Sequence, residues 1–224
     1  MARDTPRTIQ GEQPDDFEAF EVEPADDEES EEPELDPEVA ARRVAALAQI
    51  RKFGDPVLRT KARPVERFDE ALAAEVDQMG HLMGDALGVG LAATQVGVLH
   101  RLLVYRVGLH GPVAALVNPE VEWRGGETET MEEGCLSLPE VLLDVERPIH
   151  VRVRARDERG QPIVVEASGL EARVIQHEID HLDGVLILDR TSRENRKEAM
   201  RALREGTREP IQPMREGLQP HEAA

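Results

Sequence analysis

The sequence predicts an α+β fold in which antiparallel or mixed β-sheets pack around one central α-helix, with further helices flanking the strands. Three observations support this prediction. Residues 68–87 have helical periodicity, strand-like stretches follow one another between residues 101 and 167, and a second strongly periodic helix begins near residue 168. Strands in one block with helices at both ends favour this class over a doubly wound sheet, in which strands and helices alternate.

The length and charge distribution divide the chain into three parts. With 224 residues, 40% of them hydrophobic, it can form one domain with a sizeable core. Residues 12–38 contain fifteen acidic and no basic residues, whereas the whole chain has a net charge of −19. Because such a run cannot bury a core, we predict an acidic, disordered N-terminal extension (1–38), a folded domain (39–191), and a charged C-terminal helix and tail (192–224).

The N-terminal segment does not have the character of a targeting sequence. Organelle transit peptides are rich in arginine and poor in acidic residues, unlike this extension. The sequence also has no apolar run suited to a signal peptide or a membrane span. We therefore expect a cytoplasmic protein without membrane contact.

The expected elements follow in chain order. An amphipathic helix runs from Pro37 to Ile50, a turn follows at Gly54, and the long helix of residues 68–87 comes next. Strand-like stretches are found at residues 101–107, 113–118, 141–146, 149–155 and 162–167. Residues 157–161 have hairpin-turn chemistry, with Gly160 free to adopt a positive φ.

The helix after Ser168 is the best defined. Ser168 and Glu171 match a capping box, and Gly184 is a candidate left-handed stop. The inward side of this helix is expected to be formed by Leu170, Val174, His177 and His181.

His177 and His181 lie four residues apart in the run QHEIDH. On a helix this spacing brings both rings to one face, where they can bind a single metal ion, and Glu178 then lies beside the ion without binding it. The fold therefore becomes one of sheets packed around a metal-bearing helix. The alternative is that the HExxH pattern arose by chance on a charged helix, which would leave two inward histidines in need of partners.

A third ligand is not evident downstream of His181. Upstream, Cys135 is the only cysteine of the chain and lies in the segment EEGCLSLP. A lone cysteine is more commonly a small buried hydrophobic residue. With His177 and His181 it would instead complete a site with one open position, which is typical of catalytic rather than structural metal sites.

The segment GVGLAATQ, from Gly88 to Gln95, fits the spacing of a dinucleotide-binding fingerprint. The context argues against that function, because a helical rather than strand-like segment precedes it and residues 108–115 contain no acidic residue. We therefore expect no nucleotide cofactor. A glycine-rich apolar loop that ends in Gln95 instead predicts close backbone approach and one amide directed at a site.

Together, the segments GVGLAATQ, EGCLS and QHEIDH resemble, in order and spacing, the three signature motifs of peptide deformylases. The resemblance extends from about Ile50 to Thr191 and includes the stretch GDPVLR, which begins at Gly54, and the pair Asn118 and Pro119. Members of this family remove the formyl group from N-formylmethionine at new protein N-termini. The resemblance implies a catalytic domain over residues 39–191 and ferrous iron as the native ion, with zinc or nickel as frequent substitutes.

The expected roles follow from the chemistry and agree with those in the family. Cys135, His177 and His181 hold the ion, and Glu178 acts as general base and acid. The Gln95 amide and the backbone N–H of Leu136 donate to the formyl oxygen.

Further residues are expected around the substrate. Gly88 and Gly90 bring backbone close to the ion, and Glu133 and Gln176 are candidates for orienting the ligands, although a solvated Glu133 is an equally good interpretation. The residues available for a methionine pocket are Leu91, Leu142, Val174 and Ile175.

The expected partner is a nascent N-formylmethionyl peptide. The family resemblance also implies ribosome contact near the exit tunnel through the C-terminal helix, whose basic residues are Arg193, Arg196, Lys197, Arg201 and Arg204. Interleaved glutamates make a solvated, salt-bridged helix the simpler interpretation. Two other functions stay open on the residues alone, an HExxH zinc endopeptidase and a non-catalytic metal-binding module.

Overall fold

The computed structural model describes residues 7–10, 35–108 and 111–205. In these ranges the α-helices are α1 (Pro37–Leu47), α2 (Glu70–Asp85), α3 (Gly169–Leu182) and α4 (Arg193–Glu205). The strands are β1 (Arg7–Gln10), β2 (Gly90–Ala92), β3 (Leu102–Tyr105), β4 (Ala114–Arg124), β5 (Thr128–Cys135), β6 (Leu138–Pro148), β7 (His150–Arg156) and β8 (Pro162–Ser168). Short 3₁₀ turns are η1 (Pro56–Arg59), η2 (Ala93–Val96) and η3 (Ile187–Asp189).

The strands form a larger mixed sheet in the order β1-β8-β7-β4-β3-β2 and a separate hairpin of β5 and β6. Only β1 runs parallel to its neighbour in the larger sheet. The turn between β7 and β8 forms as its sequence predicts, because Asp157 accepts hydrogen bonds from the N–H groups of Arg159 and Gln161, and Gly160 has a φ of +82°.

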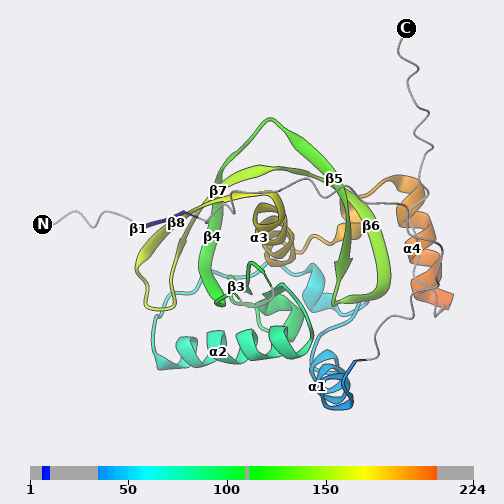
Figure 1. Cartoon of the computed structure of the whole chain (residues 1–224), viewed down its shortest axis with the longest axis horizontal. Helices are drawn as coiled ribbons and strands as arrows, with labels where there is room; N and C mark the ends of the chain where they lie inside the picture. The colour runs from blue at the N-terminus through cyan, green and yellow to red at the C-terminus, as the bar shows by residue number, and fades with distance from the viewer. Residues whose placement is uncertain (1–6, 11–34, 109–110, 206–224) are drawn as a thin grey trace, which may run out of the picture.

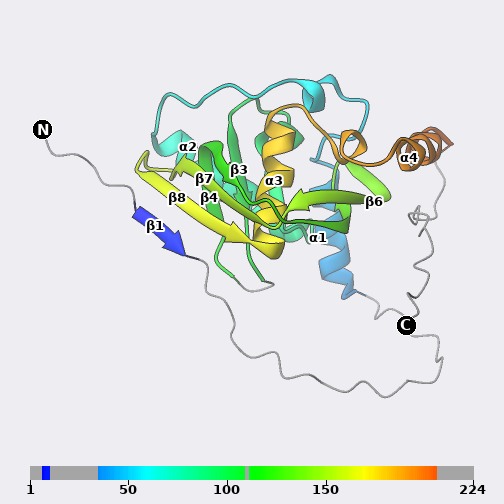
Figure 2. The same cartoon turned by 90° about the horizontal axis from the view of Figure 1, so that it is seen from above.

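Helix α3 lies between the two sheets. Figure 1 shows it nearly end-on, with β4, β7 and β8 on one side and the β5–β6 hairpin on the other, and Figure 2 shows the same enclosure from above. Ile175 and Leu182 of α3 pack in one apolar cluster with Val153 and Val165 of the larger sheet. The fold is thus the predicted α+β arrangement around this helix.

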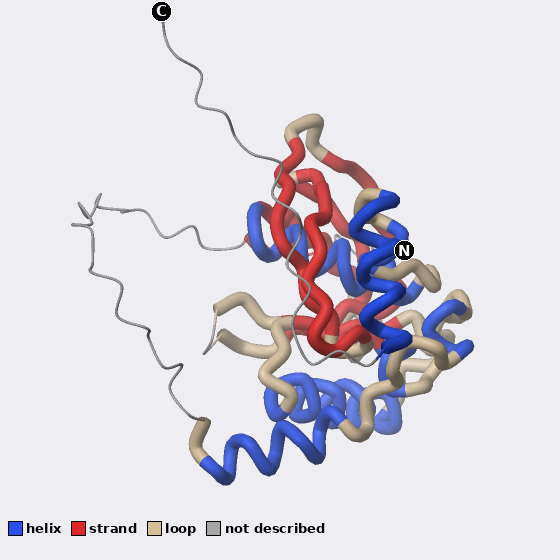
Figure 3. Tube along the Cα trace, turned by 90° about the vertical axis from the view of Figure 1, so that its right-hand side faces the viewer, coloured by secondary structure: helices blue, strands red, loops and turns tan. Residues whose placement is uncertain are grey.

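Two further clusters complete the core. Helix α2 contributes Leu72, Met79 and Met83 to a cluster that covers β2 and β3. The β5–β6 hairpin packs through Leu143 against η3 and α4, and α4 lies across the outer side of the hairpin in Figure 3. Because each element that borders α3 has its own apolar support, the position of this helix is fixed on several sides.

The start of α3 differs from the prediction. Ser168 precedes the helix, but its side chain makes no capping hydrogen bond, so the predicted capping box is wrong. Glu171 instead accepts a hydrogen bond from the Tyr105 hydroxyl at 3.1 Å. Leu170, expected on the inward side, is exposed. The predicted stop is confirmed, since Gly184 has a φ of +74° just after the helix.

Three strands were not predicted from the sequence, namely β1, which lies in the expected N-terminal extension, and β2 and β5. β2 lies within the glycine-rich segment, and β5 has mostly exposed polar residues without an apolar alternation. Each is defined by its partner strand, since β2 pairs with β3 and β5 pairs with β6. Hydrogen bonds to a neighbour can stabilise a strand whose own sequence has a weak preference.

The N-terminal extension is partly ordered, which contradicts the predicted disorder for residues 7–10. These residues pair with β8 from Arg7 opposite Ile163 to Gln10 opposite Glu166. Helix α1 begins at Pro37, inside the expected extension, because Asp36 accepts hydrogen bonds from the first backbone N–H groups of the helix. The remaining acidic residues 11–34 and the tail from residue 206 lie outside the described residues.

Candidate metal centre

Three candidate ligands from distant parts of the chain meet at one point. Cys135 ends β5, while His177 and His181 lie on successive turns of α3, and the ligand atoms of all three lie within 4.8 Å of one another. The two imidazole rings have centroids 5.0 Å apart. The predicted cluster of Cys135, His177 and His181 is therefore confirmed as a candidate metal site.

The spacing suits a tetrahedral ion. The Cys135 Sγ atom lies 3.2 Å from the His181 Nε2 atom. An ion bonded to sulfur at about 2.3 Å and to nitrogen at about 2.1 Å would hold these two atoms about 3.6 Å apart. A thiolate with two imidazoles is also a donor set that transition metals accept. The residues present therefore fit a bound divalent ion with one position left open.

The surroundings of Cys135 favour its thiolate. Burial alone would raise the pKa of the thiol, but the adjacent His181 and His177 rings outweigh it and hold that pKa well below its ordinary value. Since only a thiolate binds a metal ion strongly, the site favours the protonation state that a ligand needs.

Glu178 lies beside this cluster in a buried position. Its Oε2 atom has no hydrogen-bond partner among the described residues, and burial raises the pKa of its carboxyl group despite the nearby histidines. The carboxylate fits there because residue 90 is glycine. A Cβ atom at Gly90 would lie 2.9 Å from the Glu178 Cγ and Cδ atoms, which is closer than carbon atoms pack.

Gln95 directs its amide toward the same point. The Ala92 N–H donates to the Gln95 Oε1 atom at 2.8 Å, which fixes the side chain. The Nε2 atom consequently lies 3.3 Å from the Ser137 hydroxyl and 3.8 Å from the Cys135 Sγ atom. Leu136 lies in the turn between β5 and β6, directly after the candidate ligand Cys135.

The segment 51–53 connects these two turns. The Arg51 N–H donates to the Gln95 carbonyl oxygen at 2.7 Å, and the Phe53 N–H donates to the Ser137 carbonyl oxygen at 2.8 Å. Between them, the Lys52 ammonium donates to the Leu136 carbonyl oxygen at 2.9 Å. Three consecutive residues therefore hold the Gln95 turn and the Cys135 turn in a fixed relation.

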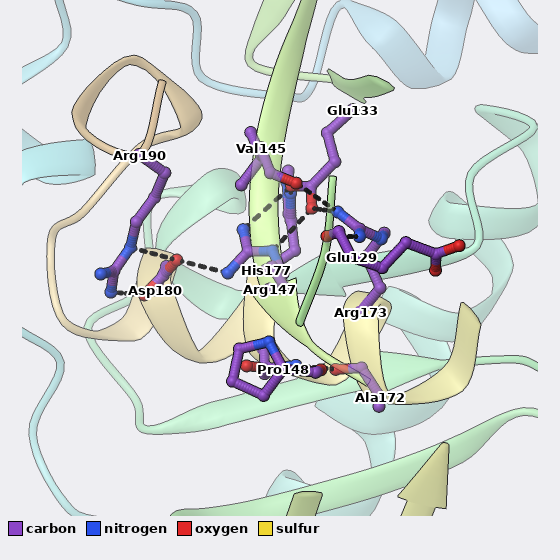
Figure 4. Close-up of polar contacts among 11 residues, drawn as sticks. Glu129, Glu133, Val145, Arg147, Pro148, Ala172, Arg173, His177, Asp180 and Arg190 are labelled. Atoms are coloured by element: carbon purple, nitrogen blue, oxygen red, sulfur yellow. Dashed lines mark hydrogen bonds and ion pairs between the residues drawn. The ribbon is translucent and has the colours of Figure 1, made fainter. Parts of the chain in front are cut away.

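Glu133 orients one ligand rather than facing solvent. Its Oε2 atom accepts a hydrogen bond from the His177 Nδ1 atom at 2.9 Å, which leaves Nε2 free to face the ion. Glu133 also accepts a bidentate pair of bonds from Arg147 and one bond from Arg173, as Figure 4 shows. The bonds from His177 and Arg147 outweigh the effect of burial and lower the pKa of Glu133 to about 2. The solvated alternative is thus wrong.

The same network extends along α3. Arg147 donates to Asp180 at 2.9 Å, and Arg190 donates to both oxygens of that carboxylate (Figure 4). Sequence reasoning missed this network, although one signal was available. Val141, Leu143 and Val145 alternate on the buried side of β6, and the next position in that alternation is Arg147.

The other predicted residues are placed as follows. Gly88, Gly90, Leu142 and Val174 line a cleft of about 750 Å³ together with Cys135, His177 and Glu178. Leu91 and Ile175, both predicted for the methionine pocket, do not line it, because both residues are fully buried in the core.

Gln176 does not touch the ligands. Its amide donates to the carbonyl oxygens of Pro148 and Ala172, each at 3.0 Å. The side chain therefore ties α3 to the end of β6, and its predicted contact with a ligand is wrong in this geometry.

Comparison with known proteins decides the family. The model of the family described as polypeptide deformylase matches residues 47–197. The chain belongs to the peptide deformylase family. A peptide deformylase from Thermotoga neapolitana is 51% identical over 144 residues, which is 64% of this chain and 87% of that protein. The Thermotoga maritima deformylase is 49% identical over 146 residues, covering 65% and 88% of the two chains.

Solved structures agree with this membership. A deformylase from Legionella pneumophila is 42% identical, with a TM-score of 0.66 over 70% of this chain and 93% of that one. A Synechococcus elongatus deformylase, solved in complex with actinonin, is 43% identical, with a TM-score of 0.67 over 74% and 91%. This chain is accordingly a metal-dependent hydrolase with deformylase activity, which removes N-formyl groups from nascent peptides.

The deformylase family match covers α2, both sheets apart from β1, and α3, and it ends within α4. Most of α1 precedes it. In the part of the chain that the structure describes, no helix has the length and apolar character needed to cross a membrane.

Proposed function

We propose that Glu178 transfers the protons of the deformylation reaction and that Cys135, His177 and His181 hold ferrous iron. The observation that carries this proposal is the buried Glu178 carboxylate, which faces the cleft beside the three candidate ligands and keeps one oxygen without a partner. A bound divalent ion would supply a water of lowered pKa and polarise the formyl carbonyl group.

Glu178 has the properties of a proton carrier. Its carboxylate accepts a proton from the attacking water and returns it to the amine of the leaving peptide. Burial raises the pKa of its carboxyl group toward neutral pH, and a proton carrier works best when its pKa is near the pH of the reaction. Since His177 and Glu178 are neighbours on a helix, they point about 100° apart around its axis, and this separation assigns Glu178 to proton transfer rather than to metal binding.

Negative charge that grows on the formyl oxygen needs donors. The Gln95 Nε2 atom is held toward the ligands by the Ala92 N–H bond to its own oxygen. The backbone N–H of Leu136 is the second donor in this proposal, since it follows the ligand Cys135 directly in the chain. Both groups belong to turns fixed by segment 51–53, so they need not reorganise during the reaction.

The shape of the cleft supports a formyl rather than an internal peptide substrate. Gly88 and Gly90 bring backbone to the cleft beside Glu178, and the space left by their missing side chains is small. A carbonyl carbon that carries only hydrogen fits such a site more readily than one that carries a Cα atom. Val174 and Leu142 provide apolar contacts for the methionine side chain.

The activity is tested by formate release from a formyl-methionyl peptide, with cleavage of a blocked internal peptide as the comparison. An HExxH endopeptidase would cleave the second substrate, and a metal-binding module would act on neither. The module would also need a fourth protein ligand, whereas the cluster found among the described residues has three. Metal analysis of anaerobically purified protein tests the assignment of iron against zinc or nickel, since the ligand set accepts all three.

The proposed setting is the ribosome in the cytoplasm, where formylated chains emerge. Helix α4 presents exposed arginines and packs on the hairpin through the buried Ala199. Sedimentation with purified ribosomes at increasing salt tests this contact, and replacement of Arg201 and Arg204 by glutamine should weaken it. Unchanged sedimentation of that double variant would leave α4 as a solvated helix.

A further inference from the structure

One wall of the cleft that contains Glu178 is formed by residues that lie almost entirely outside the region matched by the deformylase family. Helix α1 ends at residue 47, where the match begins, yet several of its residues line the same cleft as the candidate ligands Cys135 and His177. These residues are Ala40, Arg43, Val44 and Leu47, and Leu35 just before the helix joins them. Figure 1 shows α1 below the lower ends of β5 and β6.

The spacing of these residues shows that one side of α1 is involved. Positions 40, 43, 44 and 47 follow the i, i+3, i+4, i+7 pattern of a single helix face. One edge of this face is fixed to the core, because Ala46 is buried in the apolar cluster that also contains Leu72 and Met79 of α2, and Leu47 packs against the same cluster. Asp36 caps the first turn. Helix α1 is therefore a supported wall with a free, mainly apolar side.

Exposed apolar side chains gather at this cleft. Among the described residues, nine large hydrophobic side chains are exposed, and five of them line it. These five are Leu35, Val44, Leu87, Val89 and Leu170. Val44 is the most exposed of the nine, at 70%. Isolated exposed apolar residues are ordinary on a protein surface, whereas a concentration of them in one concave site marks a binding surface.

The backbone of the cleft carries a second, independent sign of function. Leu87 and Glu140, which both line it, have positive φ values of 58° and 62°. Residues other than glycine rarely adopt this conformation, and such positions cluster at ligand-binding sites. Leu87 directly precedes the glycine-rich segment, so one of these two positions adjoins Gly88 and Gly90 in the same cleft.

We propose that the face of α1 formed by Ala40, Arg43, Val44 and Leu47 is a substrate-binding wall for apolar side chains of the nascent chain beyond its formylmethionine. The inference rests on the proposed function and names a specificity determinant for it. The occupant follows from continuity, because the wall belongs to the same cleft as Glu178 and the substrate chain must continue past its first residue. A volume of about 750 Å³ lies in the range of about 300–1,000 Å³ that encloses whole drug-sized ligands, which leaves room beyond one methionine.

The test compares short and long substrates. The specificity constant kcat/KM is measured for formyl-Met-Ala, for formyl-Met-Ala-Leu-Leu and for formyl-Met-Ala-Ser-Ser. In the Val44→Asp variant, the ratio of the leucine peptide to the dipeptide should fall about three- to tenfold, mainly through KM, because a charge would replace an apolar contact. The ratio of the serine peptide to the dipeptide should change less than twofold.

Ala45→Asp is the matched control, since Ala45 is exposed on the same helix but does not line the cleft. All its ratios should equal those of the wild type. An unchanged leucine ratio in Val44→Asp would overturn the proposal. A rise in activity on every substrate would overturn it too, and would assign the wall to another segment of this protein. Absence of formate release by the wild-type protein would refute the proposed function instead.

Discussion

The Glu133 carboxylate is bonded to the His177 ring, with 2.9 Å between Oε2 and Nδ1, and thereby fixes which nitrogen of a metal ligand is available. Glu133 is buried and His177 is partly buried, and Glu133 balances two arginines at the same time. The metal site and the fold therefore depend on the same carboxylate.

Replacing the Glu133 carboxylate should weaken both metal binding and the stability of the fold. In Glu133→Gln, His177 loses its charged acceptor while Arg147 and Arg173 stay buried. We expect metal affinity to fall about 10- to 100-fold and stability to fall by about 3–5 kcal/mol. Competition with a chromogenic chelator and urea unfolding measure the two effects. Glu129→Gln, an exposed change on the same strand, is the control. Unchanged metal affinity in Glu133→Gln would contradict the orienting role.

Glu178→Gln and Cys135→Ala should separate chemistry from metal binding. The first variant keeps the ligands but loses the group that carries protons, so we expect full metal content and a rate about 10²- to 10⁴-fold lower. The second removes a ligand, so metal content and activity should fall together. Metal analysis and formate release measured on the same samples decide between these outcomes. Loss of metal in Glu178→Gln would make that residue a ligand.

Gly90→Ala should impair catalysis without loss of the metal. The added Cβ atom would meet the Glu178 side chain, which is buried and has little room to move. We expect a rate at least tenfold lower, because a small displacement of a catalytic group is costly, with metal content close to wild type. Gly126→Ala is the control, since a Cβ atom there would meet no atom within 4 Å. Wild-type activity in Gly90→Ala would show that the carboxylate can move aside freely.

Glu171 should make the stability of the folded protein depend on pH. Burial raises its pKa, although the hydrogen bond from Tyr105 partly opposes this. A raised pKa in the folded state means that the protonated form favours folding, so the stabilising contribution is full at acidic pH and is lost as the pH rises through the folded-state pKa. The Tm of Glu171→Gln minus the Tm of wild type should therefore be larger at pH 7.5 than at pH 4.

Thermal unfolding of both proteins across this pH range measures the effect. Glu70→Gln, an exposed change in the first turn of α2, serves as the comparison. A difference in Tm between Glu171→Gln and wild type that is constant with pH would contradict the assignment.

Deletion of residues 1–34 should leave the chemistry intact. The deletion keeps Leu35 and the Asp36 cap of α1 but removes the acidic segment and β1. Formate release from a small formyl peptide should stay within a few fold of the full chain. Measurements at several salt concentrations test the alternative that the segment competes with anionic partners. A large, salt-dependent change in kcat/KM would show that it acts on the cleft.

The parts of this molecule that were predictable from sequence are those fixed by local spacing. His177 and His181 share a helix face wherever that helix lies, and the alternation in residues 149–155 determines one side of a strand. Cys135 was a candidate ligand because it is the only cysteine and no ligand is evident downstream of His181, and the motif resemblance supported it, but no local rule connects residue 135 to residue 177. The burial of Glu133 depends on three partners from β6 and α3. Because these partners are distant in the sequence, a solvent-exposed Glu133 was an equally good prediction.

The predictions of the start and of the inward face of α3 were partly wrong for a related reason. The pattern Ser168 to Glu171 fits a capping box, but the structure gives Glu171 a better partner in Tyr105, which is 66 residues away in the chain. Leu170 has the right period for burial but is exposed. A long-range partner decided the position of Glu171.

The contacts of segment 51–53 imply that the cleft is preformed. The Arg51 and Phe53 amides bridge the turns that carry Gln95 and Ser137 without involving any ligand atom. We therefore expect the cleft to keep its shape when one ion replaces another, unlike small domains that fold only around their metal. Slow hydrogen exchange of these two amides, with and without a chelator, would report that rigidity directly.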